Sequence, residues 1–189
     1  MKGFKRLAAV ALAAVMTVAG TCTAFAATSP ATSVEPVKVT NTVVEASKDA
    51  PTAKVDTNTK GEATIKTIGA TKVEKVVIAT TVEVNGVEYK VTEVSAKAFA
   101  KCGEKTEAVS LPATITKIGA QAFTGSDLER VIIKSTKALK VDKTAFKGVD
   151  TKKMTIKVTK NMSKSQLTKL KKALKAAGFK GKVVQMKKH

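Results

Sequence analysis

The chain has 189 residues, and its 34 lysine and arginine residues outnumber the 15 aspartate and glutamate residues, giving a net charge of +19. Its single histidine is the last residue, His189, so a Ser-His or Cys-His nucleophile and a zinc site built from histidine and cysteine lack their partners. Because glycine-rich phosphate loops and EF-hand spacings are also absent, the sequence predicts no catalytic, cofactor-binding or metal-binding residues and no cofactor.

Residues 1–26 have the pattern of a secretory signal peptide. Positive charges come first, an apolar stretch follows from Leu7 to Gly20, and Ala24-Phe25-Ala26 provides a small-x-small cleavage pattern. The apolar stretch is shorter than the roughly 20 residues of a membrane span. We therefore expect a secreted, extracellular protein, in one version associated with the cell wall, and no membrane span. Cys22 offers a lipoprotein signal as an alternative, although the preceding Ala-Gly-Thr departs from that pattern.

Residues 27–60 are expected to form a flexible linker. They contain three of the four prolines, seven threonines and three serines, and their four lysines balance four acidic residues. Cleavage after residue 26 leaves Cys102 as the only cysteine, so no intramolecular disulfide can form. The rest of the chain is long enough for one domain with its own core.

Residues 61–94 are expected to form an amino-terminal β cap. Strands are predicted at Thr64–Ile68, Lys75–Val84 and Val87–Val94 from their β-branched residues. The last two are joined by Asn85-Gly86, and both residues tolerate the positive φ of a type I′ turn. A β-hairpin therefore closes this end of the predicted fold.

An internal repeat follows over residues 91–158. Phenylalanine recurs at intervals of 24 and 23 residues, each time five residues after a β-branched residue. Such a period indicates stacked units that cover one another's apolar edges. The predicted core of the repeat consists of Val94, Phe99, Ile118, Phe123, Val141 and Phe146. The fold class that follows is an α/β solenoid, mostly β, with about three units.

The repeat resembles a known family. The carrying motifs are Asn-Gly-x-x-Tyr-x-Val-Thr at 85–92, Ile-Thr-Lys-Ile-Gly at 115–119 and the Ala-Phe pairs. Together they resemble the BspA-like leucine-rich repeats of bacterial surface proteins, over residues 73–158. The resemblance implies a solenoid and a role in adhesion or host contact.

One column of the repeat contains Cys102, Ser126 and Val149, each the third residue after a phenylalanine. These residues share size but not chemistry, which indicates a small packing slot. Cys102 is therefore expected to be structural. The alternative is an exposed thiol that reacts or pairs between chains.

Residues 159–189 are expected to form a lysine-rich cap made of a helix and a strand. Ser163 fits the N-cap and Gln166 its capping-box partner, while Gly178 fits the C′ position of a Schellman motif. Leu167, Leu170 and Leu174 form an apolar stripe that suits a docked helix. A final strand is expected at 183–186.

Five lysines are expected on the side of this helix away from the leucines, and we take them as candidate binding residues: Lys164, Lys169, Lys171, Lys172 and Lys175. A helix lying on a membrane has a similar pattern. The caps at both ends and the narrow apolar stripe favour a docked helix.

Charge is separated along the chain. Residues 61–133 carry eight lysines and one arginine against eight glutamates and one aspartate, whereas residues 134–189 carry eighteen lysines against Asp142 and Asp150. Such a surface attracts polyanions, so the expected partners are anionic cell-wall polymers, lipid headgroups, or host surface and matrix components. Lysine lacks the bidentate geometry of arginine, and we expect no specific nucleic-acid recognition. In the alternative interpretation the lysines only keep the domain soluble.

These patterns predict an exported, non-catalytic repeat protein that acts as an interaction module. Two alternatives remain. One is a structural wall-associated protein without a host partner. The other is a small carbohydrate-active enzyme that uses loop carboxylates, such as Glu104 with Glu107 or Asp127 with Glu129. No particular oligomeric state is predicted.

Overall fold

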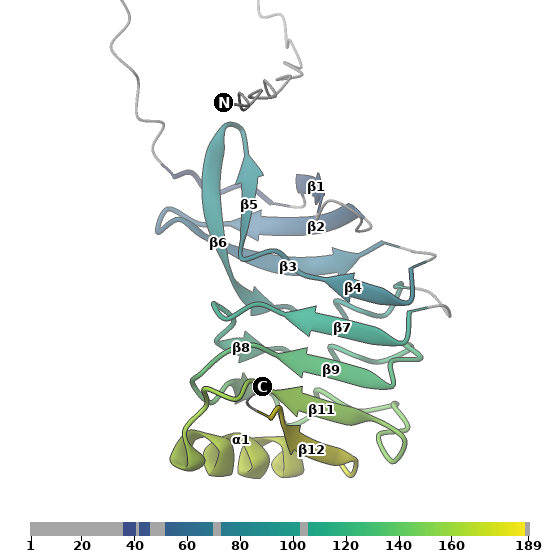
Figure 1. The fold of residues 1–189 in the computed structure, drawn as a ribbon. Coiled ribbons are helices and arrows are strands. Elements are labelled where there is room, and N and C mark those ends of the chain that lie inside the picture. The colour runs from purple at the N-terminus through teal and green to yellow at the C-terminus, as the bar shows by residue number, and fades with distance from the viewer. Residues whose placement is uncertain (1–35, 41, 46–51, 70–72, 103–105, 188–189) are drawn as a thin grey trace, which may run out of the picture. The chain divides into compact units, whose positions relative to one another are not determined.

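The computed structural model describes residues 36–40, 42–45, 52–69, 73–102 and 106–187. All of them belong to one unit that begins at Val34. Within these ranges the chain forms strands in two sheets and one helix (Figure 1). The predicted signal peptide, residues 1–26, lies outside the described residues.

The smaller sheet has five parallel strands, in the spatial order β12-β11-β9-β7-β4. Figure 1 shows them as a stack of parallel arrows. Their bounds are β4 Lys75–Val77, β7 Ala108–Leu111, β9 Arg130–Ile133, β11 Thr155–Val158 and β12 Lys182–Gln185. Val109, Val131 and Ile156 stand in register and are buried. The apolar runs that follow Phe99, Phe123 and Phe146 thus form the parallel strands β7, β9 and β11.

The larger sheet has seven strands: β1 Thr42–Glu45, β2 Thr52–Thr57, β3 Glu62–Ile68, β5 Thr81–Val84, β6 Val87–Val94, β8 Lys117–Ile118 and β10 Lys140–Val141. Strands β3, β6, β8 and β10 run parallel in that order, and β1 and β2 extend the sheet with antiparallel pairing. Val94, Ile118 and Val141 stand in register on β6, β8 and β10. Val94 and Ile118 are buried, whereas Val141 is half-buried.

The phenylalanines of the repeat stack on one another. The ring centroids of Phe99 and Phe123 lie 5.3 Å apart, those of Phe123 and Phe146 lie 5.1 Å apart, and both pairs are close to parallel. A fourth ring, Phe179, follows at 5.1 Å from Phe146 with a tilt of 51°. All four rings are buried. Since aromatic pairs contribute about 0.5–1.5 kcal/mol beyond their buried area, the column stabilises contacts between successive turns of the chain.

The hairpin at Asn85-Gly86 is confirmed. Both residues have positive φ, 52° for Asn85 and 78° for Gly86, and β5 pairs antiparallel with β6. The single strand predicted over Lys75–Val84 is wrong, because it is divided into β4 and β5, which belong to different sheets. Between them the Ile78 N–H donates to Ser110 in the small sheet, and the Thr80 carbonyl accepts from Val91 in the large one. The alternating sequence pattern does not indicate this crossing.

The linker prediction for residues 27–60 is wrong for the segments that form β1 and β2, which pair with each other. Ala53 and Val55 are fully buried, and β2 pairs with β3. Further upstream, the Val37 N–H donates to the Tyr89 hydroxyl at 2.8 Å. The alternation of Ala53 and Val55 with polar residues is typical of a strand, whereas the surrounding threonine- and proline-rich composition is typical of a linker. The segment forms a strand because the edge of β3 is open to it, and this edge exists only in the folded chain.

The helix α1 spans Lys164–Ala176 and buries Leu170 and Leu174. The Ser163 hydroxyl accepts the Gln166 N–H at 3.3 Å, which confirms the N-cap. The capping-box role predicted for Gln166 is wrong, because its side-chain oxygen accepts the Ala138 N–H at 2.9 Å. Gln166 therefore attaches α1 to the loop before β10 instead of closing the helix on itself.

The carboxyl end of α1 has the predicted Schellman motif. Gly178 has a φ of 84°, the Phe179 N–H donates to the Leu174 carbonyl at 3.0 Å, and the Gly178 N–H donates to Lys175 at 3.1 Å. The chain then turns into β12, which pairs parallel with β11. This final strand agrees with the prediction.

Candidate interaction site

The five predicted lysines all lie on α1 and are exposed, opposite the buried leucines. Each helical residue turns by about 100°, so Lys171 and Lys175 lie within about 40° of each other. On the same geometry, Lys169 lies about 120° beyond Lys175. The lysines therefore cover a broad arc of the helix, and Lys171 and Lys175 line a hollow that they share with Val183 of β12.

The described lysines from Lys134 to Lys187 are all exposed, and none of them takes part in an ion pair. The ion pairs found in the described part of the chain lie further toward the amino terminus. Lys117 contacts Glu93 at 2.7 Å, and Lys66 contacts Asp56 at 3.3 Å. The positive charge of the last third is thus not neutralised by salt bridges within the described structure.

The two acidic residues of this region are used in turns. The Asp142 carboxylate accepts the Thr144 hydroxyl at 2.7 Å and the Thr144 N–H at 2.8 Å. These hydrogen bonds, with a smaller contribution from nearby lysines, lower the pKa of Asp142. Asp150 accepts the Lys152 N–H at 3.1 Å. Both carboxylates therefore stabilise the turns in which they lie, by accepting hydrogen bonds from residues two positions further along the chain.

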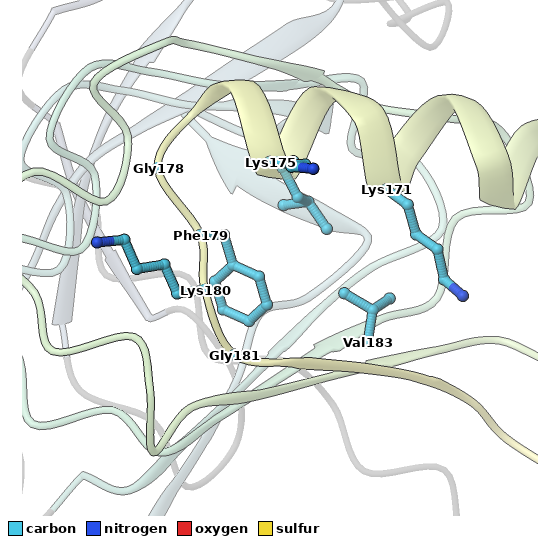
Figure 2. Close-up of a pocket in the computed structure, with 8 residues that line it drawn as sticks. Lys171, Lys175, Gly178, Phe179, Lys180, Gly181 and Val183 are labelled. Atoms are coloured by element: carbon cyan, nitrogen blue, oxygen red, sulfur yellow. The ribbon is translucent and has the colours of Figure 1, made fainter.

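A hollow of about 500 Å³ lies between the carboxyl-terminal half of α1 and the start of β12 (Figure 2). Leu174, Phe179 and Val183 supply apolar lining, and Lys171 and Lys175 line it from the helix. The hollow contains no acidic lining residue. It combines an apolar surface with ammonium groups, which suits an amphipathic anionic group.

A second hollow, of about 630 Å³, lies along the other face of the same strand, over β11 and β12. Val184 and Met186 line it and are 47% and 36% exposed, unusual values for large apolar side chains in the described residues. Lys157, Lys160 and Lys187 lie around them. The sequence pattern predicts only a capping strand at these residues. The pattern does not indicate that β12 has a neighbouring strand on one side only among the described strands.

The match to a family model agrees with this architecture. The model of the BspA type leucine rich repeat region matches six copies over residues 61–187. The chain belongs to the BspA-type leucine-rich repeat family. No curated protein matches the chain significantly.

One solved structure is similar to this BspA-type chain. It is the crystal structure, at 2.00 Å resolution, of a leucine-rich repeat protein from Bacteroides capillosus ATCC 29799. The two are 22% identical, the similarity covers 66% of this chain and 99% of the other, and the TM-score is 0.37.

The family match also bears on the number of repeats. Six copies are found where the phenylalanine spacing predicts about three, and they extend over the segments interpreted as caps. The fourth ring in the stack, Phe179, comes from one of these segments. The prediction of three units between two caps is therefore not confirmed.

The carboxylates considered for catalysis lie in open positions. Asp127 and Glu129 line a hollow of about 260 Å³ together with Asp150, and all three are exposed. A carboxylic acid that donates a proton at neutral pH needs a raised pKa, which usually comes from burial. Glu107 is exposed as well, and Glu104 lies outside the described residues. This arrangement gives no support to a glycosidase-like pair, and the BspA-type family points to a non-enzymatic repeat protein.

Cys102 is fully buried and forms no disulfide. Burial raises the pKa of its thiol to about 11, so the reactive thiolate is scarce at neutral pH. The Cys102 N–H donates to the Phe99 carbonyl at 3.2 Å. The next residue in its column, Ser126, donates its N–H to the Phe123 carbonyl at the same distance. These observations agree with a packing role for Cys102.

Two kinds of feature are absent from the described residues. They contain no group of three or more histidine, cysteine, aspartate or glutamate side chains placed to hold a metal ion. In the same ranges, no helix has the length and apolar character needed to cross a membrane.

Proposed function

We propose that this protein is a secreted or surface-associated, non-catalytic interaction module whose basic carboxyl-terminal third binds anionic polymers. The observation that carries the proposal is the set of exposed lysines beyond residue 133 that lack ion pairs in the described structure. Membership of the BspA-type family supports an interaction role, and the predicted signal peptide supports export.

The fold provides a rigid base for this surface. In the proposed arrangement, the phenylalanine-marked turns over residues 91–158 form the centre of a short solenoid. The hairpin segment, 61–94, closes one end together with β1 and β2, which pair beyond β3, and the helix and strand of 159–189 close the other. The stacked rings of Phe99, Phe123 and Phe146 support this arrangement. The lysines of α1 are then displayed at one end of the stack.

Binding at this surface is expected to depend on charge more than on ligand shape. An ammonium group is a hydrated point charge that recognises anions without the fork geometry of arginine. The aromatic rings of this end, Phe146 and Phe179, are buried and are not available for stacking on bases. Cell-wall polymers and host matrix polyanions fit this chemistry, whereas specific nucleic-acid recognition does not.

The proposal is tested by binding of the mature chain to purified wall fractions and to host matrix polyanions at two salt concentrations. The Debye length falls from about 8 Å at 0.15 M salt to about 3 Å at 1 M. We therefore expect binding at the lower concentration and its loss at the higher one. Binding that is unchanged by salt, or no binding to any polyanion, would contradict the proposal.

A charge-neutralised variant locates the site. Exposed ion pairs contribute about 0.2–1 kcal/mol each, and 1.4 kcal/mol is a tenfold change in affinity. Replacing the five helix lysines by glutamine should thus weaken binding about fivefold or more; they are Lys164, Lys169, Lys171, Lys172 and Lys175. The matched control changes five exposed lysines outside this region that take part in no ion pair of the described structure: Lys60, Lys75, Lys90, Lys97 and Lys101. If both variants lose the same affinity, net charge alone is responsible.

A further inference from the structure

Strand β12 forms the end of the five-stranded sheet, and no strand of the described chain pairs with its outer edge. On the inner side, the Lys182 N–H donates to Met154 at 3.1 Å and the Met186 N–H donates to Val158 at 2.9 Å. Because backbone groups alternate between the two edges of a strand, those of Val183 and Gln185 are directed outward. An open edge of this kind can accept another strand.

An apolar ladder across the sheet stops at this edge. Its five members stand in register, one on each strand: Val76, Val109, Val131, Ile156 and Val183. The first four are at most 1% exposed, whereas Val183 is half-buried. Val183 lines the hollow beside α1 together with Phe179 and Leu174, and Figure 2 shows Val183 and Phe179 below the helix. A strand added at the edge would bring its inward side chains to this hollow, where the ladder would continue.

The other face of the edge has the same combination of apolar and basic groups. Val184 and Met186 follow Lys182 on alternate residues, so the three share one face of β12. The register places Val184 beside Lys157 of β11. Neither of the two hollows along β12 has an acidic lining residue. An added strand would therefore meet apolar contacts and ammonium groups on both of its faces.

These features select the occupant. If a second copy of the chain paired β12 with β12, it would bring further lysines and no carboxylate to this edge, because the charged residues at 180–187 are all lysines, and like charges across a strand pair are destabilising. Lysine on an edge strand is a known protection against such self-pairing. A segment with carboxylates at these places gains attraction instead. We propose that β12 binds an extended, acidic peptide segment of a partner protein, which adds a strand to the sheet and inserts an apolar side chain beside Val183.

This inference goes beyond the proposed binding of polyanions, because polymer binding at α1 needs charge alone whereas strand addition needs backbone hydrogen bonds. The probe is a short synthetic peptide of alternating valine and glutamate. Two modified versions carry methyl groups on the backbone nitrogens of alternate residues. One version loses the N–H donors of one edge of the peptide, and the other loses those of the opposite edge. We expect one of the two to bind at least about tenfold more weakly than the parent peptide, because strand addition depends on main-chain hydrogen bonds. Equal binding of all three peptides would overturn the proposal.

Hydrogen exchange locates the contact. Addition of the parent peptide should slow exchange of the Val183 and Gln185 amides about tenfold or more, because they become donors to the added strand. A peptide with lysine in place of glutamate should give no protection. Protection confined to α1 would overturn the proposal. A dimer in sedimentation whose β12 amides are already protected without peptide would overturn it as well.

A variant separates this site from the polyanion surface. Val183→Pro removes one outward N–H and keeps the inner hydrogen bonds of Lys182 and Met186, which edge strands tolerate. It should lose peptide binding and retain polyanion binding, whereas Val183→Thr, which keeps the N–H, should bind the peptide better than the proline variant. If Val183→Pro unfolds the strand, the methylated peptides still decide the question. A folded Val183→Pro variant that binds the peptide normally would contradict strand addition.

Discussion

The turns of the chain before residue 134 and those after it share one packing scheme and differ in their surfaces. In both regions buried strand residues stand in register, and the phenylalanine column runs from Phe99 to Phe179 without a break. The earlier turns balance their charges and contain the ion pair of Lys117 with Glu93. The later turns carry exposed lysines without ion pairs in the described structure. The difference indicates that stability resides in the columns that all turns share, and it underlies our proposal that binding resides in the lysines that one end adds.

The shared scheme would be broken most by removing the central ring of the column. Phe123 is fully buried between Phe99 and Phe146. Phe123→Ala should lower the free energy of unfolding by about 3–5 kcal/mol, the usual cost of deleting a buried aromatic ring. Urea denaturation measures this loss, with Phe123→Leu as the smaller deletion. A loss under about 1 kcal/mol would show that the column does not hold the turns together.

The basic end has its own point of close packing, at Gly181. A Cβ on this residue would collide with the Met154 and Thr151 carbonyl oxygens and with the Phe179 ring. Gly181→Ala should therefore cost about 3 kcal/mol, the upper end of typical overpacking penalties, and should displace β12.

The matched control is Gly178→Ala, where a Cβ meets no atom within 4 Å. Its positive φ makes alanine unfavourable there by about 1 kcal/mol. Thermal denaturation compares the two variants. If Gly181→Ala is as stable as Gly178→Ala, β12 is not packed as closely as the structure shows.

The attachment of the basic helix to the repeat can be tested at Gln166. Its side-chain oxygen accepts the Ala138 N–H at 2.9 Å. Gln166→Ala should cost about 1 kcal/mol, the net contribution of one hydrogen bond. Gln166→Glu keeps an acceptor at this position and should cost less. Chemical denaturation measures the loss of unfolding free energy in both variants. Equal losses would argue against this attachment.

The smallest expected effect concerns Cys102 in the charge-balanced region. Its thiol pKa is raised from 9.0 to about 11. The folded state therefore favours the protonated thiol, and this contribution to stability is present below pH 9 and lost as the pH rises toward 11. The melting temperature of Cys102→Ala should thus fall less over this interval than that of the parent chain. Rapid alkylation of native Cys102 at pH 7 would contradict its burial.

Residues whose role is set by their immediate neighbours could be predicted from the sequence. The Asn85-Gly86 turn, the Ser163 N-cap, the Gly178 end of the helix and the repeat of Phe99 follow from local backbone preferences and periodicity. The hydrogen-bond partner of the Gln166 side chain could not be predicted. Its oxygen could accept from the backbone of the N-cap or from another segment, and only the fold brings Ala138 near. The division of Lys75–Val84 between two sheets is likewise a tertiary event.

Of the candidate site, only the positive charge could be predicted from the sequence. The lysines of α1 are visible in the sequence, and the structure places them on the exposed side of the helix. The hollow beside Val183 and the exposed Val184 arise because β12 has a neighbour on one side only among the strands that the structure describes. The sequence Lys-Val-Val-Gln at 182–185 does not indicate whether a strand lies inside a sheet or at its edge, so this part of the site required the three-dimensional arrangement.

The central claim is that binding resides in the turns after residue 133, and an amide map of the mature chain titrated with a linear polyphosphate tests it most directly. NMR shift changes should fall within residues 134–187, centre on α1, and disappear at about 1 M salt, where the Debye length is about 3 Å. Shift changes centred on the charge-balanced turns of 61–133, or changes that persist at high salt, would contradict the account.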